Sequence, residues 1–556
     1  MQEALQDRAA ATTQLYADPH NPHRHLARGL VYERLSFPDL AAADAYRALS
    51  LLDSVVDPDG CEFHARRVTG SEDDSEPITE DEYNKLIGPV YALLTRSLVR
   101  CGCLRDAYEF GIRGRTVLHE LSGPEGLSAK DIEEQISIIK DKAHGNKNKD
   151  GDKDGNGEIN PSTLKAQGSA RRILYPWNNH EPDRRSPETL SLLNNRLKDI
   201  APKCEVRAVT LPVLHQEKEK EEEKGPEKAE EREGEEEVSI QLGLFAKEHL
   251  HPGQKILTET SLLTATNRLH DDTCDACNAP LPPLSAENPP VPCAACADII
   301  FCTQNCHDRA QETYHGAVCG LMENLDPIGK DIPDARDKAD YLYLLLLGRA
   351  LAMSATQELH PLDLPEVKYI WGDFVRDTSD PGSNTEENLE EQETLPFSFH
   401  LSILQPMRLL EEMGLDPYIS LPSYDTWVLN TLYAKFRGTA SGRLSTWDGT
   451  PETCAVHPLW CLANHSCDPN VRWEWGAEIA FVVRSQEERV VWKRGGEVLK
   501  QGDGDGDGKG IEKDEEILNH YCDVGLDVKQ RREWAAGALG GKCLCTRCVW
   551  EAGESK

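Results

Sequence analysis

The sequence predicts an α+β protein built from several domains. Its 556 residues are too many for a single hydrophobic core. The N-terminal quarter has the small-residue spacing of packed helices, and the C-terminal half gathers cysteines in short pairs at metal-ligand spacing. We therefore expect a helical domain followed by a metal-stapled domain.

Residues 1–142 are predicted to form the helical domain. Small residues and one tyrosine recur there at distances that let two antiparallel helices pack closely: Gly29, Tyr32, Ala41, Ala45 and Ala48. A poorer second copy runs through Leu98, Gly102 and Ala107 to about His119. The pattern resembles a tetratricopeptide repeat, and the alternative is an unrelated helical bundle.

A third amphipathic helix is expected after the second copy. Ile132, Ile136 and Ile139 share one face of it, and Ser128 and Asp131 have the spacing of a capping box. The interval 143–237 is predicted to be a charged linker with some helix, because Glu217 to Glu237 are almost entirely Glu and Lys.

The formal net charge of −35 argues against direct binding to nucleic acids or membrane surfaces, which requires basic patches. A basic protein partner fits better. The N-terminal residues Met1 to Ala4 do not begin a signal segment, and no apolar run approaches the roughly 20 residues of a membrane span. We expect a soluble protein of the nucleus or the cytoplasm.

Eighteen cysteines would indicate disulfides in a secreted chain, but seven of them between Cys274 and Cys319 and three between Cys543 and Cys548 have metal-ligand spacing. The first cluster contains eight ligands in four pairs, enough for two tetrahedral zinc ions. The pairs are Cys274 and Cys277, Cys293 and Cys296, Cys302 and Cys306, and His315 and Cys319. The other cysteines are scattered, and buried structural thiols are the default expectation for them.

Residues 274–319 resemble the MYND zinc finger, whose two sites interleave. The resemblance implies that the first and third pairs hold one zinc ion and that the second and fourth pairs hold another. Few core-forming residues lie in this segment, so metal binding would supply much of its folding free energy.

The most specific motif runs from Asn464 to Asn470 and reads Asn-His-Ser-Cys-Asp-Pro-Asn. Tyr521 follows it, and then a tail with Cys543, Cys545 and Cys548. This order resembles the SET domain, and the interrupting finger makes the SET- and MYND-domain lysine methyltransferases the family that the chain resembles. The resemblance covers about Val238 to Trp550.

The family resemblance implies a domain organisation. The SET domain of small β-sheets would span 238–530, interrupted by the finger and by a helical insert at 321–436. A post-SET tail would span 531–550. Within the insert, Tyr341 to Met353 and Tyr424 to Phe436 have helical patterns.

The resemblance also implies the activity, which is transfer of a methyl group from S-adenosylmethionine to a protein lysine. Tyr521 would be the catalytic residue and would also contact the cofactor. The other implied cofactor contacts are Gly243, Leu244, Phe245, Asn464 and His465. The substrate would be a histone or another basic protein, and the helical region and the finger would offer sites for peptide partners.

The tail cysteines provide only three thiolates, whereas a closed structural zinc site takes four ligands. By resemblance Cys467 is the fourth, so three zinc ions are expected in all. Three positions depart from the family pattern: Gln241, Leu242 and Gly541. They favour the alternative function, a catalytically inactive adaptor that binds proteins.

Overall fold

The computed structural model describes most of the chain, and the prediction for Glu217 to Glu237 lies outside the described part. The described residues are 2–56, 78–122, 126–145, 159–171, 173–212, 238–268, 272–296, 298–333, 337–371, 394–445, 449–490, 492–494, 497–498, 510–539 and 541–553. Within these ranges no helix combines the length and the apolar character needed to cross a membrane. The chain divides into two compact units, and each is assembled from segments far apart in the sequence.

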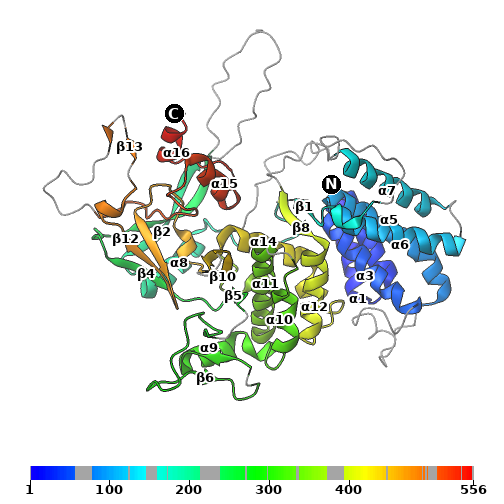
Figure 1. Ribbon diagram of the computed structural model, residues 1–556, viewed down its shortest axis with the longest axis horizontal. Helices are drawn as coiled ribbons and strands as arrows, with labels where there is room; N and C mark the ends of the chain where they lie inside the picture. The colour runs from blue at the N-terminus through cyan, green and yellow to red at the C-terminus, as the bar shows by residue number, and fades with distance from the viewer. Residues whose placement is uncertain are drawn as a thin grey trace, which may run out of the picture. The chain divides into compact units, whose positions relative to one another are not determined.

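Unit 1 consists of Met1–Tyr175, Leu321–Pro333 and Arg376–Thr431 and is mainly helical. Figure 1 shows its N-terminal helices in blue and cyan. Its elements are α1 (Gln2–Ala17), α2 (Pro22–Arg34), α3 (Pro38–Val56), α5 (Glu80–Cys101), α6 (Leu104–Ser122), α7 (Leu127–Gly145), the 3₁₀ turn η1 (Pro161–Thr163), β1 (Gln167–Arg171), α10 (Met322–Lys330), β8 (Thr394–Ser398), the π-helical turn η7 (His400–Leu404), α12 (Gln405–Glu412), α13 (Leu421–Tyr424) and the first turns of α14 (Thr426–Thr439).

The first helix pair depends on small residues at its contact. Gly29 of α2 lies so close to α3 that an added Cβ would be 3.3 Å from the Cβ of Asp44 and 3.5 Å from the carbonyl oxygen of Ala41. Ala41, Ala45 and Ala48 are fully buried along the facing side of α3. The helices expected in residues 1–142 are therefore present, and the repeat family remains a prediction.

The capping box predicted at Ser128 and Asp131 is wrong. Helix α7 begins one residue before Ser128, and the Lys130 N–H donates to the carbonyl of Gly126, so Ser128 lies inside the first turn. The Asp131 carboxylate instead accepts a hydrogen bond from the Arg96 guanidinium of α5. The carboxylate that the local pattern assigned to a cap therefore forms an ion pair between α7 and α5.

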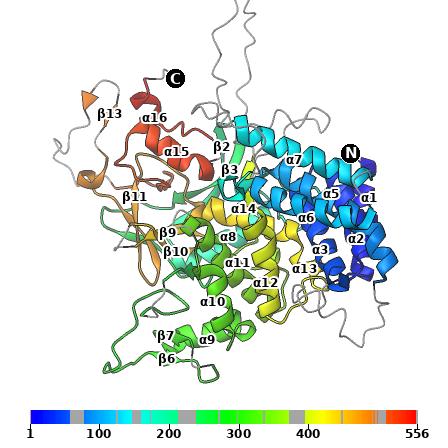
Figure 2. The same ribbon diagram turned by 45° about the vertical axis from the view of Figure 1, so that its right-hand side comes forward.

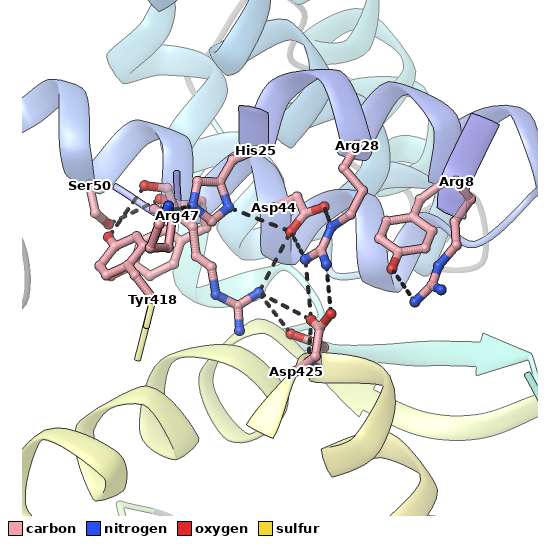
Figure 3. Close-up of polar contacts among 12 residues, drawn as sticks. Arg8, His25, Arg28, Asp44, Arg47, Ser50, Tyr418 and Asp425 are labelled. Atoms are coloured by element: carbon pink, nitrogen blue, oxygen red, sulfur yellow. Dashed lines mark hydrogen bonds and ion pairs between the residues drawn. The ribbon is translucent and has the colours of Figure 1, made fainter. Parts of the chain in front are cut away.

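A buried ion-pair network joins the N-terminal helices of unit 1 to the turn before α14 (Figure 3). The Arg28 guanidinium donates to Asp44 and to Asp425, each at 2.7 Å, and Arg47 lies 3.8 Å and 3.9 Å from the same two carboxylates. These four side chains are at most 3% exposed. Two positive and two negative charges balance, which offsets the cost of removing them from water. Part of the expected helical insert thus packs with residues 1–175.

Unit 2 consists of Pro176–Gly320, Asp334–Val375 and Leu432–Lys556 and contains helices and small sheets. Its helices and helical turns are α8 (Pro187–Ile200), α9 (Gln304–Thr313), η2 (His315–Ala317), α11 (Lys338–Gln357), η4 (Pro361–Asp363), η8 (Trp460–Leu462), η9 (Gln486–Glu488), α15 (Val528–Leu539), α16 (Thr546–Glu551) and the last turns of α14. Its strands are β2 (Cys204–Pro212), β3 (Val238–Ala246), β4 (Lys255–Glu259), β5 (Thr264–Thr266), β6 (Val291–Pro292), β7 (Ile300–Phe301), β9 (Ser441–Leu444), β10 (Pro451–Ala455), β11 (Val471–Trp475), β12 (Ile479–Val483), β13 (Lys493–Arg494) and β14 (Glu497–Val498).

The sheets of unit 2 are small and antiparallel, with strand orders β2-β3, β5-β10-β9, β11-β12-β4, β6-β7 and β13-β14. The mixed helix-and-sheet fold with small sheets is therefore confirmed. The interval 143–237, expected as charged linker, also carries β2, which pairs along its whole length with β3. Figure 2 shows α8, β2 and β3 in the same part of the structure.

After an exposed turn at Glu512 to Glu515, the chain from Glu516 to Asn519 runs between β3 and the Asn464 motif. On one side Ile517 N–H donates to the Leu244 carbonyl, and on the other Asn519 N–H donates to the Asn464 carbonyl. Isolated bridges join Phe245 to Glu516 and His465 to Asn519. This segment therefore brings β3, the Asn464 motif and Tyr521 together.

Candidate functional site

The four cysteines expected to hold the tail zinc ion form one cluster. The Sγ atoms of Cys467, Cys543, Cys545 and Cys548 all lie within 4.8 Å of one another. The Cys467 sulfur is 4.0 Å from that of Cys543 and 3.3 Å from that of Cys548. A tetrahedral zinc ion with sulfur ligands at about 2.3 Å requires sulfur separations of about 3.8 Å. The cluster could therefore hold zinc.

Two arginines support the tail cluster from outside. Arg531 of α15 donates to the Cys548 sulfur at 3.5 Å and to Glu551 at 2.5 Å. Arg547 of α16 donates to the backbone carbonyl of Cys467 at 2.8 Å. Cationic donors next to thiolates offset the negative charge of a four-cysteine site and fix the positions of the sulfurs.

The finger cysteines form two further clusters. Cys274, Cys277, Cys302 and Cys306 make one group, and Cys293, Cys296, His315 and Cys319 make the other, each within 4.8 Å. The measured separations are 3.7 Å from Cys277 to Cys302 and 3.9 Å from Cys293 to Cys319, again near the tetrahedral value of about 3.8 Å. Each group could hold one zinc ion, and the grouping is the interleaved one.

An aromatic and ionic contact anchors the finger to helix α11. The Arg349 guanidinium lies 3.6 Å from the ring centroid of Tyr314 and donates to the Asp275 carboxylate at 3.2 Å. The Tyr314 hydroxyl donates to the same carboxylate at 2.6 Å. Because Asp275 directly follows the predicted ligand Cys274, this contact fixes the first ligand pair in space.

A third type of cluster contains His180, His360 and Asp363. The two imidazoles are stacked, with centroids 3.8 Å apart and an interplanar angle of 8°. Imidazole lone pairs lie in the ring plane, so parallel stacked rings do not aim them at one ion. The Asp363 carboxylate already accepts from His180 and from Lys368, each at 2.8 Å. We assign no metal to this cluster.

Tyr521 is bonded twice to the segment that begins the Asn464 motif. Its hydroxyl donates to the backbone carbonyl of Ala463 at 2.9 Å, and its backbone N–H donates to Nδ1 of His465 at 3.0 Å. Burial raises the pKa of the Tyr521 hydroxyl above its usual value, so the hydroxyl stays protonated at neutral pH.

His465 lies between the tyrosine and the tail cluster. Burial lowers the pKa of its imidazole to about 4, so the ring is neutral at neutral pH. Since Nδ1 accepts from Tyr521, the ring proton is on Nε2, which lies 3.3 Å from the Cys467 sulfur. One side chain thus connects the predicted catalytic residue to a predicted zinc ligand.

Asn464 joins β3 to Glu516. Its side-chain amide donates to the Leu242 carbonyl at 3.0 Å and to Glu516 Oε1 at 2.7 Å. A Cβ on Gly243 would lie 2.7 Å from the same Glu516 oxygen and 3.2 Å from the Asn464 amide nitrogen. Burial raises the pKa of the Glu516 carboxyl, an effect that the Asn464 hydrogen bond partly offsets. Only glycine fits at position 243 without displacing this carboxylate.

The two remaining predicted cofactor contacts, Leu244 and Phe245, are on opposite faces of β3. Leu244 is fully buried in the core, so its side chain does not reach a ligand. Phe245 is on the same face as Gly243 and lies under the Arg207 guanidinium, with 5.1 Å from carbon to ring centroid. Gln241 and Leu242 pair regularly with Val209 and Ala208 in β2.

Gly541, which departs from the family pattern, and two other residues lie near the tail cysteines. Gly541 is buried directly before the tail cysteines. Trp550 is 42% exposed and lies near Trp492, with 6.3 Å between ring centroids. Cys522 belongs to a separate group with His465 and Cys467, within 4.8 Å.

Three charged residues of this region carry no sequence signal of their own: Glu259 and Arg531, which are buried, and Glu516, which is partly buried. Glu516 lies in the segment that leads to Tyr521, and it shares a hydrogen bond with Asn464 of the motif. Glu259 is the last residue of β4, and its partners lie two hundred residues later in the chain, Leu459 and Trp460. Only the folded chain brings them together.

Comparison with protein-family models finds none that matches this chain, and comparison with curated proteins finds no match either.

Proposed function

We propose that the protein is an S-adenosylmethionine-dependent protein-lysine N-methyltransferase with a SET domain, a MYND-type finger and a zinc-bound tail. One observation carries the proposal: Tyr521, the Asn464 motif and the tail cysteines, which are far apart in sequence, converge through His465. A residue set that only stabilised a sheet would not need to connect a metal cluster to a half-buried tyrosine.

The cofactor would supply a methyl group on a positively charged sulfur. By the family resemblance, the residues near it would be the β3 segment at Gly243 to Phe245, with Asn464, His465 and Tyr521. The contribution of Leu244 to such a site is limited to its backbone, because its side chain is in the core. Glu516 adds a carboxylate next to Gly243 and Asn464.

Tyr521 has a restricted role in this proposal. Its only hydroxyl proton is donated to Ala463, so its oxygen can accept hydrogen bonds from a substrate amine but does not donate to it. Because the raised pKa keeps the hydroxyl protonated, Tyr521 orients the amine and the methyl group and does not act as a general base at neutral pH.

The acceptor lysine must be neutral to attack. A free lysine with a pKa near 10.4 would lose its proton at neutral pH at a cost of about 4 to 5 kcal/mol. Burial next to a cationic sulfonium lowers that cost by desolvation and like-charge repulsion. The acceptor would be a histone or another basic protein in the nucleus or cytoplasm, consistent with the charge of −35.

Calorimetric titration of the purified protein with S-adenosylmethionine tests the proposal. We expect saturable binding by the wild-type protein and weakened binding by Asn464→Ala, which loses the link between Leu242 and Glu516. Asn430→Ala, which changes an asparagine of unit 1 that binds Asp39, is the matched control and should bind like wild type. Absence of binding by the wild-type protein would contradict the proposal.

The second candidate function is a catalytically inactive adaptor that binds proteins through the helical unit and the finger. The regular pairing of Gln241 and Leu242 in β3 favours it, because these positions do not form the glycine-rich loop of the family. Both candidates use the zinc clusters. The same titration separates them, since an adaptor needs no cofactor.

A further inference from the structure

Glu259 is a buried carboxylate that none of the expected motifs includes. It is the last residue of β4, pairs with Ile479 of β12 and is 7% exposed. Burial raises the pKa of its carboxyl to about 7, and two backbone hydrogen bonds counteract the shift. The charged side chains that face it are Arg196 of α8, which lowers the pKa, and Glu366, which raises it.

The carboxylate of Glu259 binds the start of the turn η8. The Leu459 N–H donates to it at 3.2 Å, and the Trp460 N–H donates at 2.8 Å. The first N–H groups of a helical turn have no partner within the turn, and η8 has no side-chain cap of its own. Both residues are buried, so these donors would be unpaired without Glu259.

The turn that Glu259 holds ends at the acceptor of the Tyr521 hydroxyl. Ala463 follows η8 directly, and its N–H donates to the Trp460 carbonyl at 3.3 Å. Its own carbonyl accepts from Tyr521, and the next residue is Asn464. A shift of the turn would therefore move the hydroxyl of Tyr521 and the first residue of the Asn464 motif together.

We propose that Glu259 is a positioning residue for the methyl-transfer centre: by fixing the N–H groups of Leu459 and Trp460, it sets the orientation of the Tyr521 hydroxyl through Ala463. This inference rests on the proposed function only because it calls the surroundings of Tyr521 the methyl-transfer centre. In the described part of the chain Glu259 forms no ion pair with a lysine or arginine, so the reach of its oxygens to the two N–H groups matters more than its charge.

Two substitutions separate the effect of the side-chain length at position 259 from the effect of its charge. Glu259→Gln keeps the side-chain length and a carbonyl acceptor but loses the charge. Glu259→Asp keeps the charge, but it shortens the side chain and cannot maintain both bonds. The control is Glu478→Ala, a 45% exposed carboxylate beside the same strand pair, which contacts Lys255.

The readout is the ¹⁹F NMR signal of the full-length chain with 3-fluorotyrosine at position 521 alone, and kcat and KM are measured on unlabelled variants. We expect the fluorine signal to move in Glu259→Asp and to stay near wild type in Glu259→Gln and Glu478→Ala. The kcat of Glu259→Asp should fall roughly tenfold or more while KM for S-adenosylmethionine changes little.

A fluorine signal that does not move in Glu259→Asp, or that moves in Glu259→Gln but not in Glu259→Asp, overturns the proposal. The fluorine signal requires no turnover. If the wild-type protein transfers no methyl group, the proposed function fails, and the fluorine experiment still decides whether Glu259 positions Tyr521.

Discussion

The hydroxyl of Tyr521 donates a 2.9 Å hydrogen bond to the backbone carbonyl of Ala463, the residue directly before Asn464. This bond commits the only proton of the hydroxyl to the protein. Together with the bond from the Tyr521 N–H to His465, it makes the orientation of the ring depend on the backbone of residues 463–465. The tyrosine and the Asn464 motif therefore form one structural unit.

Gly243→Ala should destabilise unit 2, because the new methyl group would lie 2.7 Å from Glu516 Oε1. We expect a loss of about 1 to 3 kcal/mol in the free energy of unfolding, measured by urea denaturation. Gly442→Ala, where a Cβ meets nothing within 4 Å, is the control. The double variant Gly243→Ala/Glu516→Ala should lose less free energy of unfolding than the two single variants lose in sum. Strict additivity would show that Glu516 does not impose glycine at this position.

Cys467→Ser should remove one of three expected zinc ions and weaken S-adenosylmethionine binding. Serine is a poor zinc ligand, and structural zinc sites contribute on the order of 10 kcal/mol. Native mass spectrometry counts the ions. Cys454→Ser, a buried thiol of β10 whose sulfur lies 3.7 Å from the Leu342 carbonyl, should keep all three. Three ions bound to Cys467→Ser would mean that another residue, such as Cys522, is the fourth ligand of the tail zinc ion.

Glu259→Gln should change how stability depends on pH. The folded protein holds a proton on Glu259 up to a pKa of about 7, while the unfolded chain releases it near the usual value of 4.5. The contribution of Glu259 to wild-type stability is thus fully present below pH 4.5 and is lost as pH rises toward 7, by up to about 3 kcal/mol. Urea denaturation at pH 5 and pH 7.5 should show this decrease in wild type and a smaller one in Glu259→Gln. An equal decrease in the free energy of unfolding in wild type and in Glu259→Gln would contradict the raised pKa of Glu259.

Asp425→Ala should strongly destabilise unit 1, because it leaves Arg28 with only Asp44 as a buried counter-charge. Breaking a buried ion pair from one side costs about 3 to 5 kcal/mol. The exposed pair of Asp7 and Arg34 is the control, and Asp7→Ala should change the urea midpoint little. Similar midpoints for the two variants would show that the network contributes no stability.

Local spacing predicted the metal clusters well and the domain boundaries less completely. Short cysteine pairs constrain their own geometry, so the eight finger ligands could be identified from their spacing, while their grouping into two sites came from the resemblance to the MYND finger. The three tail cysteines indicated that a fourth ligand was needed. The helix at Tyr341 to Met353 was likewise visible in its apolar pattern and lies within α11.

Features that depend on distant contacts were not visible in the sequence. Strand β2 is stable because β3 pairs with it, and Glu259 acts on a turn two hundred residues later. The charge network of Asp425 attaches residues 394–431 to the N-terminal helices. The misassigned cap at Asp131 has the same cause, since its partner is Arg96 on another helix.

Transfer of a trideuterated methyl group from labelled S-adenosylmethionine to lysine in a mixture of core histones, detected by mass spectrometry, tests the account most directly. The wild-type protein should label lysine side chains. Tyr521→Phe should reduce kcat by roughly a hundredfold or more while remaining folded. Tyr418→Phe, which removes another buried hydroxyl that donates to a carbonyl, at 3.4 Å, should label like wild type. Wild-type rates in Tyr521→Phe, or no labelled lysine with any acceptor in the wild-type reaction, would contradict the account.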